Sequence, residues 1–333
     1  MSITTPPPTT AGTGRRHPRG RPSSGDGVAA GALAAVWCRS VGPARRWSFT
    51  SSALPRRPGR GHHGLDHLGR TDLSSAVYVE HNAPRGDVPY TRHPMADRSD
   101  IPVVHVTPFN ELFWDSGRAP TVVIEHGIPD PGHRYTGELD RAAVVINEPV
   151  RRSRVTGTDL LSRFAAQAPL DVFGMVVSEL ASSVSPELNS RAVRPARDSS
   201  AVELGRDSAV DGPGSIRTFE HLPQAQLFAE LARRRVYLHP IRWTSLGLSL
   251  LEAMHLGMPV VALATTEVVE AVPPQAGVVS TRVEVLIEAF ALLPQRSRLR
   301  PPGGTAARAA ARARYSMDRF LTDWEQLLKE MRR

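Results

Sequence analysis

From residue 75 onward, short β-branched runs alternate with segments of helical periodicity, and this alternation limits most strongly how the chain can fold. Residues 142–147 (AAVVIN) and 236–241 (VYLHPI) have the length and composition of buried strands, and a helical pattern follows each of them. Strands joined through helices pair in parallel, because a parallel crossover needs a dozen or more residues. The sequence therefore predicts an α/β protein with a doubly wound parallel sheet.

The expected elements form two blocks, separated by a turn-rich loop at residues 130–140. The first block has strands at 76–82, 102–109 and 121–128 and a helix at 110–117. The second block has strands at 142–147, 170–176, 215–222, 236–241, 258–264 and 276–280, and helices at 157–167, 224–234, 249–256, 282–293 and 306–331. Residues 178–213 are polar and weakly patterned, which predicts a long loop or a degraded strand-and-helix unit. We expect domains at 75–140 and 141–300, followed by a helical segment at 301–333.

Residues 1–74 differ from the rest in composition. Residues 1–70 hold 11 arginines, 8 prolines and 11 glycines against two acids, Asp26 and Asp66, and have one apolar stretch, at 28–37. Such a segment buries too little apolar surface to offset its chain entropy, so we expect it to be mostly disordered. Arginines on both sides of the apolar stretch fit a secretory signal poorly, and the prolines oppose the helix of a transit peptide. A start site or reading frame other than the natural one is a further interpretation.

Composition also excludes several classes of protein. No apolar stretch approaches the ~18 residues of a membrane-crossing helix, and the single cysteine, Cys38, excludes a disulfide scaffold. The net charge of +8 arises in residues 1–70, because the other 263 residues hold 30 basic and 31 acidic side chains. Nucleic-acid binding is therefore not expected. The expected localisation is cytoplasmic, with the basic segment as a candidate for peripheral contact with the inner membrane face.

The loop after Ile241 is the most informative candidate site. Ligands of such sheets bind beyond the carboxyl ends of the strands, and this loop leads directly into a helix that carries Glu252. Gly247 allows a close backbone approach, and the amides at the start of a helix attract phosphate. Glu252, one turn into the helix, could accept hydrogen bonds from paired sugar hydroxyls. The alternative interpretation is a turn glycine followed by a solvated glutamate.

Two sequence segments here resemble a known family. Residues 237–240 (YLHP) and 245–262 (SLGLSLLEAMHLGMPVVA) resemble the donor-binding signature of family-4 retaining glycosyltransferases, which have the GT-B fold of two Rossmann-like domains. The tripeptide that begins at Glu270 looks like the family's Glu-Val-Val, and residues 147–161 are similar to its arginine-containing loop and helix. The resemblance covers about residues 76–330 and implies a GT-B chain whose first domain is incomplete.

The resemblance implies roles for the residues around the second domain's loops. Glu252 matches the glutamate that binds the ribose hydroxyls of a nucleotide-sugar donor. Arg151 or Arg152, together with Arg154, stands where the family holds the donor diphosphate. The loop before the helix lies where backbone amides meet the donor's phosphate or sugar. Its donor-binding residues are Ser245, Leu246, Gly247 and Leu248.

Two further positions bear on catalysis. His81, at the end of the first expected strand, resembles the family histidine that reaches the donor sugar. Thr244 stands eight positions before Glu252, where the family has its first glutamate, so Thr244 or Ser245 would contact the sugar differently. His105 and His126 end or interrupt comparable strands, and for both a structural role is the alternative. No His/Cys cluster has metal-ligand spacing, so neither a cofactor nor a metal is expected.

The resulting hypothesis is a glycosyltransferase that moves a sugar from a UDP- or GDP-linked donor to an unidentified hydroxyl acceptor with retention of configuration. The acceptor would be a glycan, a lipid or a small molecule. Two alternatives stay open, namely a non-catalytic sugar-nucleotide-binding protein with a defective acceptor domain and a GT-B nucleotide-sugar epimerase.

Overall fold

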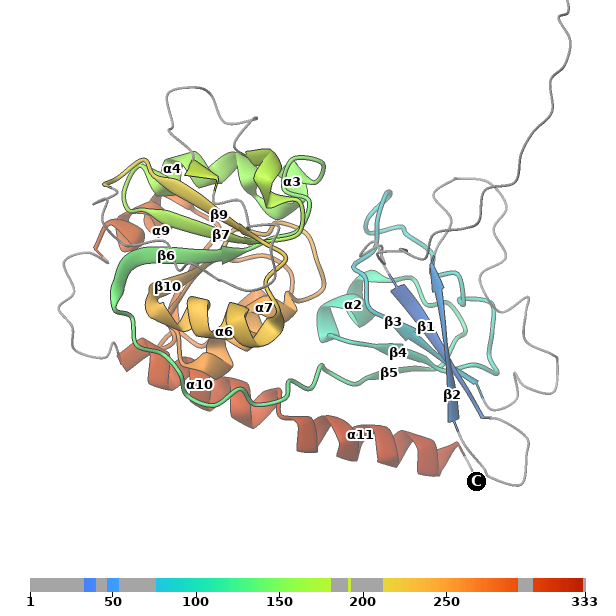
Figure 1. Ribbon diagram of the computed structural model, residues 1–333. Helices are drawn as coiled ribbons and strands as arrows, with labels where there is room; N and C mark the ends of the chain where they lie inside the picture. The colour runs from blue at the N-terminus through green and yellow to red at the C-terminus, as the bar shows by residue number, and fades with distance from the viewer. Residues whose placement is uncertain are drawn as a thin grey trace, which may run out of the picture. The chain divides into compact units, whose positions relative to one another are not determined.

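The structure is a computed structural model, and the residues it describes form two β-sheets with their helices (Figure 1). Side chains are described for residues 76–180, 212–292 and 303–331. For residues 33–39, 47–53, 191–192 and 302 only the backbone is described.

The second sheet in the chain has seven parallel strands in the order β12-β11-β10-β6-β7-β9-β8. Its strands are β6 (Leu139–Val145), β7 (Leu170–Gly174), β8 (Arg191–Ala192), β9 (Ile216–Glu220), β10 (Arg234–His239), β11 (Val260–Leu263) and β12 (Gly277–Ser280). All six strands expected in the second block are present. The seventh, β8, lies at the edge of the sheet, in the stretch predicted to be a long loop or a degraded unit, and it fits the second of these alternatives. A strand of two residues is too short to show any periodicity, and it forms by pairing with β9.

Helices cover both faces of this sheet, as the alternation of strands and helices predicts. Along β6, Ala143 faces one apolar cluster, whereas Ala142 and Val144 face the other. One face packs against α6 (Gln224–Arg233), α7 (Leu248–Leu256), α8 (Val268–Ala271) and α10 (Pro302–Arg314). The other packs against η2 (Thr158–Leu160), α4 (Leu161–Ala165) and α9 (Val283–Ala291). The short helices α3 (Ser153–Thr156) and η3 (Val177–Glu179) lie in loops that follow β6 and β7.

The first sheet has five strands in the order β2-β1-β3-β4-β5. They are β1 (Leu33–Arg39), β2 (Trp47–Ala53), β3 (Ala76–Glu80), β4 (Val103–His105) and β5 (Thr121–Val123). The last three are parallel, whereas β1 pairs antiparallel with both β2 and β3. The prediction of disorder for residues 1–74 is therefore wrong for β1 and β2. β1 overlaps the one apolar stretch of that segment, and it covers an edge of β3 that would otherwise be unpaired. The rest of residues 1–74 lies outside the described residues.

The helix α2 (Pro108–Phe113) begins two residues before the predicted start and ends four residues early. Thr107 caps it, because its hydroxyl accepts a hydrogen bond from the Asn110 amide at 3.1 Å, and proline is favoured at the first helical position. This cap ends the preceding strand at His105, earlier than the apolar pattern of residues 102–109 predicts.

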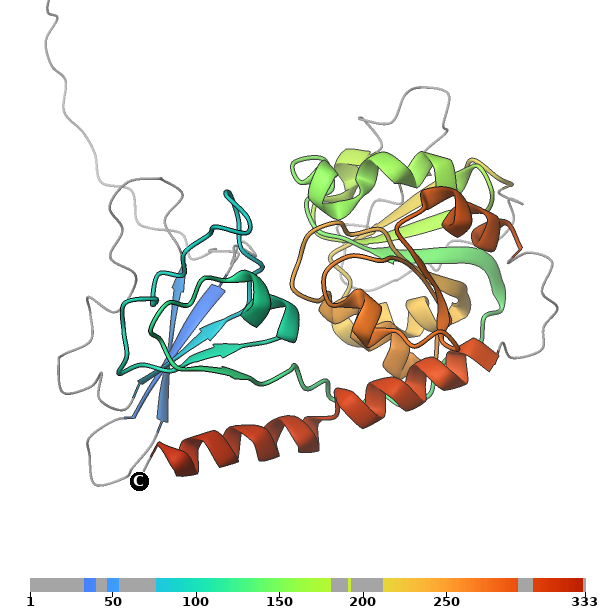
Figure 2. The same cartoon turned by 180° about the vertical axis from the view of Figure 1, so that it is seen from behind.

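The predicted single helix at 306–331 is two helices, α10 and α11 (Met317–Glu330), visible in red in Figure 2. The chain breaks at Tyr315, whose buried ring belongs to the core below the second sheet, and Ser316 caps α11 by accepting from the Arg319 amide. α11 packs its apolar face against the valines of β3 and β4. The contributing side chains are Phe320, Trp324, Leu327 and Met331.

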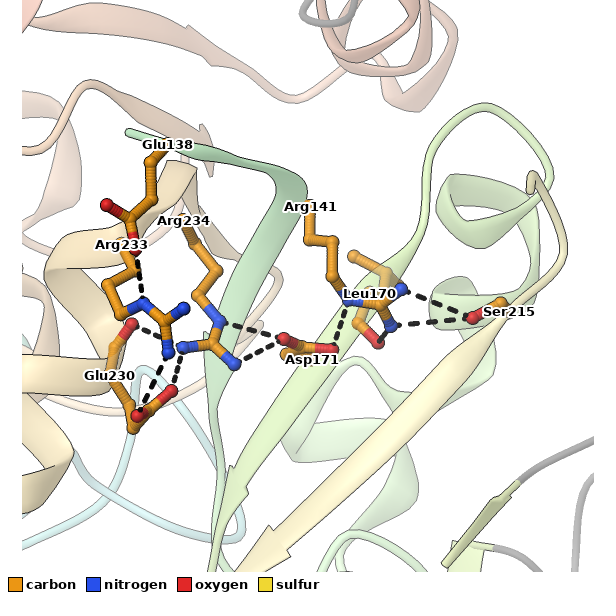
Figure 3. A network of polar contacts seen from close by, with 8 residues as sticks. All are labelled: Glu138, Arg141, Leu170, Asp171, Ser215, Glu230, Arg233 and Arg234. Carbon is orange, nitrogen blue, oxygen red and sulfur yellow. Dashed lines mark hydrogen bonds and ion pairs between the residues drawn. The ribbon is translucent and has the colours of Figure 1, made fainter. Parts of the chain in front are cut away.

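A buried ionic network crosses the amino ends of β6, β7 and β10 (Figure 3). The Asp171 carboxylate accepts from Arg141 Nε at 2.6 Å and pairs with Arg234 Nη2 at 2.7 Å. The Arg234 guanidinium also lies 5.2 Å from the ring centroids of both Phe173 and Phe219. The network thus occupies the edge of the sheet opposite the loops at the carboxyl ends of the strands.

Candidate functional site

The helix α7 begins at the carboxyl end of β10 without a side-chain cap. Its N-cap is Gly247, which has an ordinary backbone conformation with φ of −73°. A Cβ at Gly247 would lie 2.6 Å from His239 Cε1, so the glycine is required by close packing against this ring. The uncapped helix start offers backbone amides and the positive end of the helix dipole to an anion.

His239 is a buried residue that the sequence analysis does not single out. It is fully buried at the end of β10, and neither ring nitrogen has a hydrogen-bond partner among the described residues. Burial lowers the pKa of His239 to about 4, so the imidazole is neutral at physiological pH. The only signal in the sequence is one polar residue in the otherwise apolar run 236–241.

Glu252 lies one turn into α7 and is half-buried. Gln224, the first residue of α6, donates a hydrogen bond from Nε2 to Glu252 Oε1 at 3.1 Å. Burial raises the pKa of Glu252, and the bond from Gln224 opposes that shift. A carboxylate held at this place, next to an anion-attracting helix start, is suited to accept hydrogen bonds from neighbouring hydroxyls of a phosphorylated ligand.

The loop before α7 is tied to the loop after β3 by two hydrogen bonds. Ser245 Oγ donates to the His81 carbonyl at 2.7 Å, and Trp243 Nε1 donates to the Pro84 carbonyl at 2.8 Å. Thr244 lies between these two anchored residues and is half-buried.

The other predicted donor-binding residues of this loop differ in what they can offer to a ligand. The Leu246 side chain is buried in the core, so its backbone is the part that could meet a ligand, whereas the Leu248 side chain is 48% exposed.

The three predicted diphosphate-binding arginines have different surroundings. Arg151 is exposed and donates from Nε to Glu148 at 2.8 Å, and exposed Arg154 lies 3.7 Å from Asp159. Arg152, at the N-cap of α3, is half-buried. Its pKa is lowered, first by burial and then by repulsion from Arg85 and Arg151. Arg85 lies in the loop after β3 and is absent from the residues that the sequence analysis selects.

The segment that carries Arg152 is held against the loop before α7. The Arg242 amide donates to the Val155 carbonyl at 2.8 Å, and the Arg242 side chain donates to Asp159. Gly157 has φ of +73°, and a Cβ there would overlap the Pro240 carbonyl oxygen, so only glycine fits. The loops after β3, β6 and β10 therefore converge.

His81 and His126 stack on each other, with ring centroids 5.8 Å apart and an interplanar angle of 13°. Both are half-buried, and burial lowers both pKa values, that of His126 to about 4. The two rings are therefore neutral at pH 7. His105 is instead fully buried, with Nε2 3.3 Å from Ser116 Oγ, which fits the structural role considered for it.

The structure changes the assignment of the Glu-Val-Val resemblance. Glu270 is exposed, whereas Glu267, at the N-cap of α8 in the loop after β11, is buried. Glu267 accepts from the Phe109 amide at 3.0 Å and from Arg314 at 2.7 Å, and burial raises its pKa. Residues 267–269 read Glu-Val-Val in the sequence itself, so this signal was available. We therefore assign the Glu-Val-Val resemblance to residues 267–269 and no longer to the tripeptide that begins at Glu270.

Among the residues that the structure describes, no group of three or more His, Cys, Asp or Glu side chains could hold a metal ion. None of the described helices has the length and apolar character needed to span a membrane.

Comparisons with known proteins place part of the chain in a known family of sequences. The family described as glycosyl transferases group 1 matches residues 199–295. No curated protein sequence gives a significant match.

Three solved structures are similar to the chain. The G117R mutant of S. aureus TarM, in complex with fondaparinux, alpha-GlcNAc-glycerol and UDP, is 14% identical with a TM-score of 0.53, over 75% of this chain and 50% of that one. The pneumococcal O-GlcNAc transferase GtfA, in complex with UDP and GlcNAc, is 13% identical with a TM-score of 0.54, over 76% and 52%. Sucrose-phosphate synthase from Thermosynechococcus elongatus is 15% identical with a TM-score of 0.51, over 69% and 58%.

The chain spans about half the length of these structures. At such identities the likeness concerns the fold, and the fold is the GT-B arrangement that the sequence predicts.

Proposed function

We propose that this chain, a GT-B protein whose residues 199–295 match the group 1 glycosyl transferases, moves a sugar from a nucleotide-sugar donor to a hydroxyl acceptor. The observation that carries the proposal is the uncapped start of α7 with Glu252 one turn later and half-buried Arg152 on a neighbouring loop. These groups match a nucleoside diphosphate, which has a negative diphosphate at one end and paired ribose hydroxyls near it.

In this proposal Glu252 accepts hydrogen bonds from the ribose hydroxyls, and the amides at the start of α7 bind the diphosphate. As the bond from the sugar to the diphosphate breaks, negative charge develops on the leaving oxygen. Arg152 stabilises that charge from a fixed position, so no reorganisation is needed at the moment of reaction. The acceptor hydroxyl attacks from the face that the diphosphate leaves, and the leaving phosphate takes its proton, which retains the configuration.

The donor is proposed to carry UDP or GDP. Solved structures of similar fold contain UDP, which supports a uridine donor as the first choice. His81, held in the loop tied to Ser245, is proposed to contact the donor sugar as a neutral imidazole. Thr244 occupies the position of the family's first glutamate, and its hydroxyl is proposed to replace that carboxylate as the sugar contact.

Two measurements test the proposal. The first is calorimetric titration of the purified chain with UDP, GDP and their sugars, where selective binding of one base is expected. The second is release of nucleoside diphosphate from the bound donor, which a transferase performs only when an acceptor is present. Donor isomerisation without acceptor would instead support an epimerase, and binding without turnover over a broad acceptor panel would support a binding protein. No binding of any nucleotide would refute the donor site.

A further inference from the structure

The loop that follows β3 is fixed along its length by hydrogen bonds to its carbonyls. His81 O accepts from Ser245, Asn82 O accepts from Trp114 Nε1 at 2.9 Å, and Pro84 O accepts from Trp243. Since Ala83 and Pro84 are also buried, the backbone just before Arg85 has a set path. Arg85 therefore leaves this loop beside the residues that lead into α7.

Arg85 and Arg152, which we call the arginine pair, differ from the arginines near them in their ionic partners. Among the residues that the structure describes, neither forms an ion pair, whereas the neighbouring arginines each have a carboxylate. Arg151 pairs with Glu148, and Asp159 serves both Arg154 and Arg242. Arg152 is half-buried and lies in the repulsive field of Arg85. Arg85 is exposed, so the repulsion acts mainly on the half-buried Arg152, and an anion bound between the two guanidinium groups would be attracted by both.

We infer that Arg85 is a second diphosphate-binding arginine, contributed by the first sheet, and that the arginine pair holds the departing diphosphate from two sides. This inference rests on the proposed function, because it assigns a further residue to the same donor site. The loop after β10 contacts both segments, through Trp243 and Ser245 to the loop after β3 and through Arg242 to Val155 near Arg152, so it holds the two guanidinium groups toward one ligand. A guanidinium binds phosphate oxygens in a bidentate manner, which gives geometric selectivity as well as charge.

The substituted protein Arg85→Gln tests the inference against Arg118→Gln, which removes an exposed arginine of the same sheet that donates to a backbone carbonyl. Calorimetric titration of the full chain at fixed ionic strength compares UDP, UMP and inorganic pyrophosphate. Arg85→Gln should weaken UDP and pyrophosphate binding about tenfold and UMP binding much less, whereas Arg118→Gln should match the unsubstituted chain. An equal loss for UDP and UMP would overturn the inference.

Pyrophosphate separates this inference from the proposed function. Suppose that no nucleotide binds, that pyrophosphate does bind, and that Arg85→Gln lowers the affinity for pyrophosphate. The proposed function then fails, whereas the inference that the arginine pair binds a diphosphate is supported. Unchanged pyrophosphate binding in Arg85→Gln overturns the inference, whatever the nucleotides do. Thermal unfolding without ligand is the second readout. Arg85→Gln should unfold at or above the temperature of Arg118→Gln, because it removes repulsion, and a clear drop below it would make the role structural and overturn the inference.

Discussion

The hydroxyl of Ser245 donates a 2.7 Å hydrogen bond to the backbone carbonyl of His81, and this bond joins the loop before α7 to the loop after β3. Ser245 is buried, so its side chain is engaged within the protein. The predicted contact of Ser245 with the donor would therefore be made by its backbone. The bond also means that the candidate sugar-contacting residue, His81, and the candidate phosphate-binding helix start take their positions from one another.

The carboxylate of Glu252 should be required for nucleotide affinity. Glu252→Gln replaces a charged acceptor by a neutral one, and we expect UDP or GDP affinity to fall about tenfold to a hundredfold. Calorimetric titration measures this, and Glu288→Gln, an exposed substitution on α9, is the control. Because burial raises the pKa of Glu252, affinity should also decline as the pH falls through that raised pKa, and this part of the decline should be absent in Glu252→Gln. Equal affinities for both substituted proteins would remove Glu252 from the site.

The close contact between Gly247 and His239 should appear as coupling between two substitutions. Gly247→Ala puts a methyl group 2.6 Å from the His239 ring, which should cost about 1–3 kcal/mol of unfolding free energy and weaken nucleotide binding by displacing the start of α7. His239→Ala in the same chain makes room for that methyl group. Urea unfolding of both single variants and the double variant gives the coupling energy, which should be about 1 kcal/mol or more in the favourable direction. Simple additivity of the two effects would contradict the steric explanation.

The carboxylate of Asp171 should be a large contributor to stability. Asp171→Ala leaves Arg141 and Arg234 buried without the carboxylate that they share, and breaking such a pair costs about 3–5 kcal/mol. Urea unfolding followed by circular dichroism measures the loss. Glu284→Ala, which removes an exposed ion pair with Arg163, should leave the midpoint almost unchanged. Similar midpoints for both proteins would show that the network contributes no more than a surface pair.

Burial of neutral His239 should make the protein sensitive to mild acid. The folded pKa of about 4 lies below the unfolded value of about 6.5, so between these values the unfolded chain binds a proton that the folded chain does not. The stability from the neutral imidazole is complete above about pH 6.5 and is lost as the pH falls toward 4. Between pH 7 and pH 5 the unfolding free energy of the unsubstituted chain should fall by about 1–2 kcal/mol more than that of His239→Leu. Exposed His133→Leu is the control and should follow the unsubstituted chain.

The sequence predicts the second sheet well because most of its six longer strands are short apolar runs with a helix pattern beside them. It fails where an element depends on a distant partner. β8 exists through pairing with β9, and β1 through pairing with β3. The break at Tyr315 is also invisible in the helical periodicity, because what ends α10 there is the burial of this ring in the core below the second sheet.

The residues of the candidate site likewise fall into those that the sequence identifies and those that it misses. Glu252 and Gly247 lie in one continuous motif, so local spacing and resemblance identify both. Arg85, His239 and Glu267 acquire their importance from contacts with segments far away in the chain. Glu267, for example, meets Phe109, 158 residues earlier. No local sequence pattern predicts such a contact, although the Glu-Val-Val at residues 267–269 matches the family's tripeptide and thereby indicates Glu267.

The packing of α11 has a consequence for how the protein is made. The apolar face formed by β3 and β4 is covered by residues 317–331, which leave the ribosome long after the strands themselves. Domains generally fold in the order of synthesis, amino-terminal first. In this protein the first sheet keeps an exposed apolar face until α11 has been synthesised, and by then the second sheet has formed its core. A nascent chain would therefore depend on chaperone protection for its first sheet, and translation that stalls before residue 317 would yield a folded second sheet attached to an aggregation-prone first one.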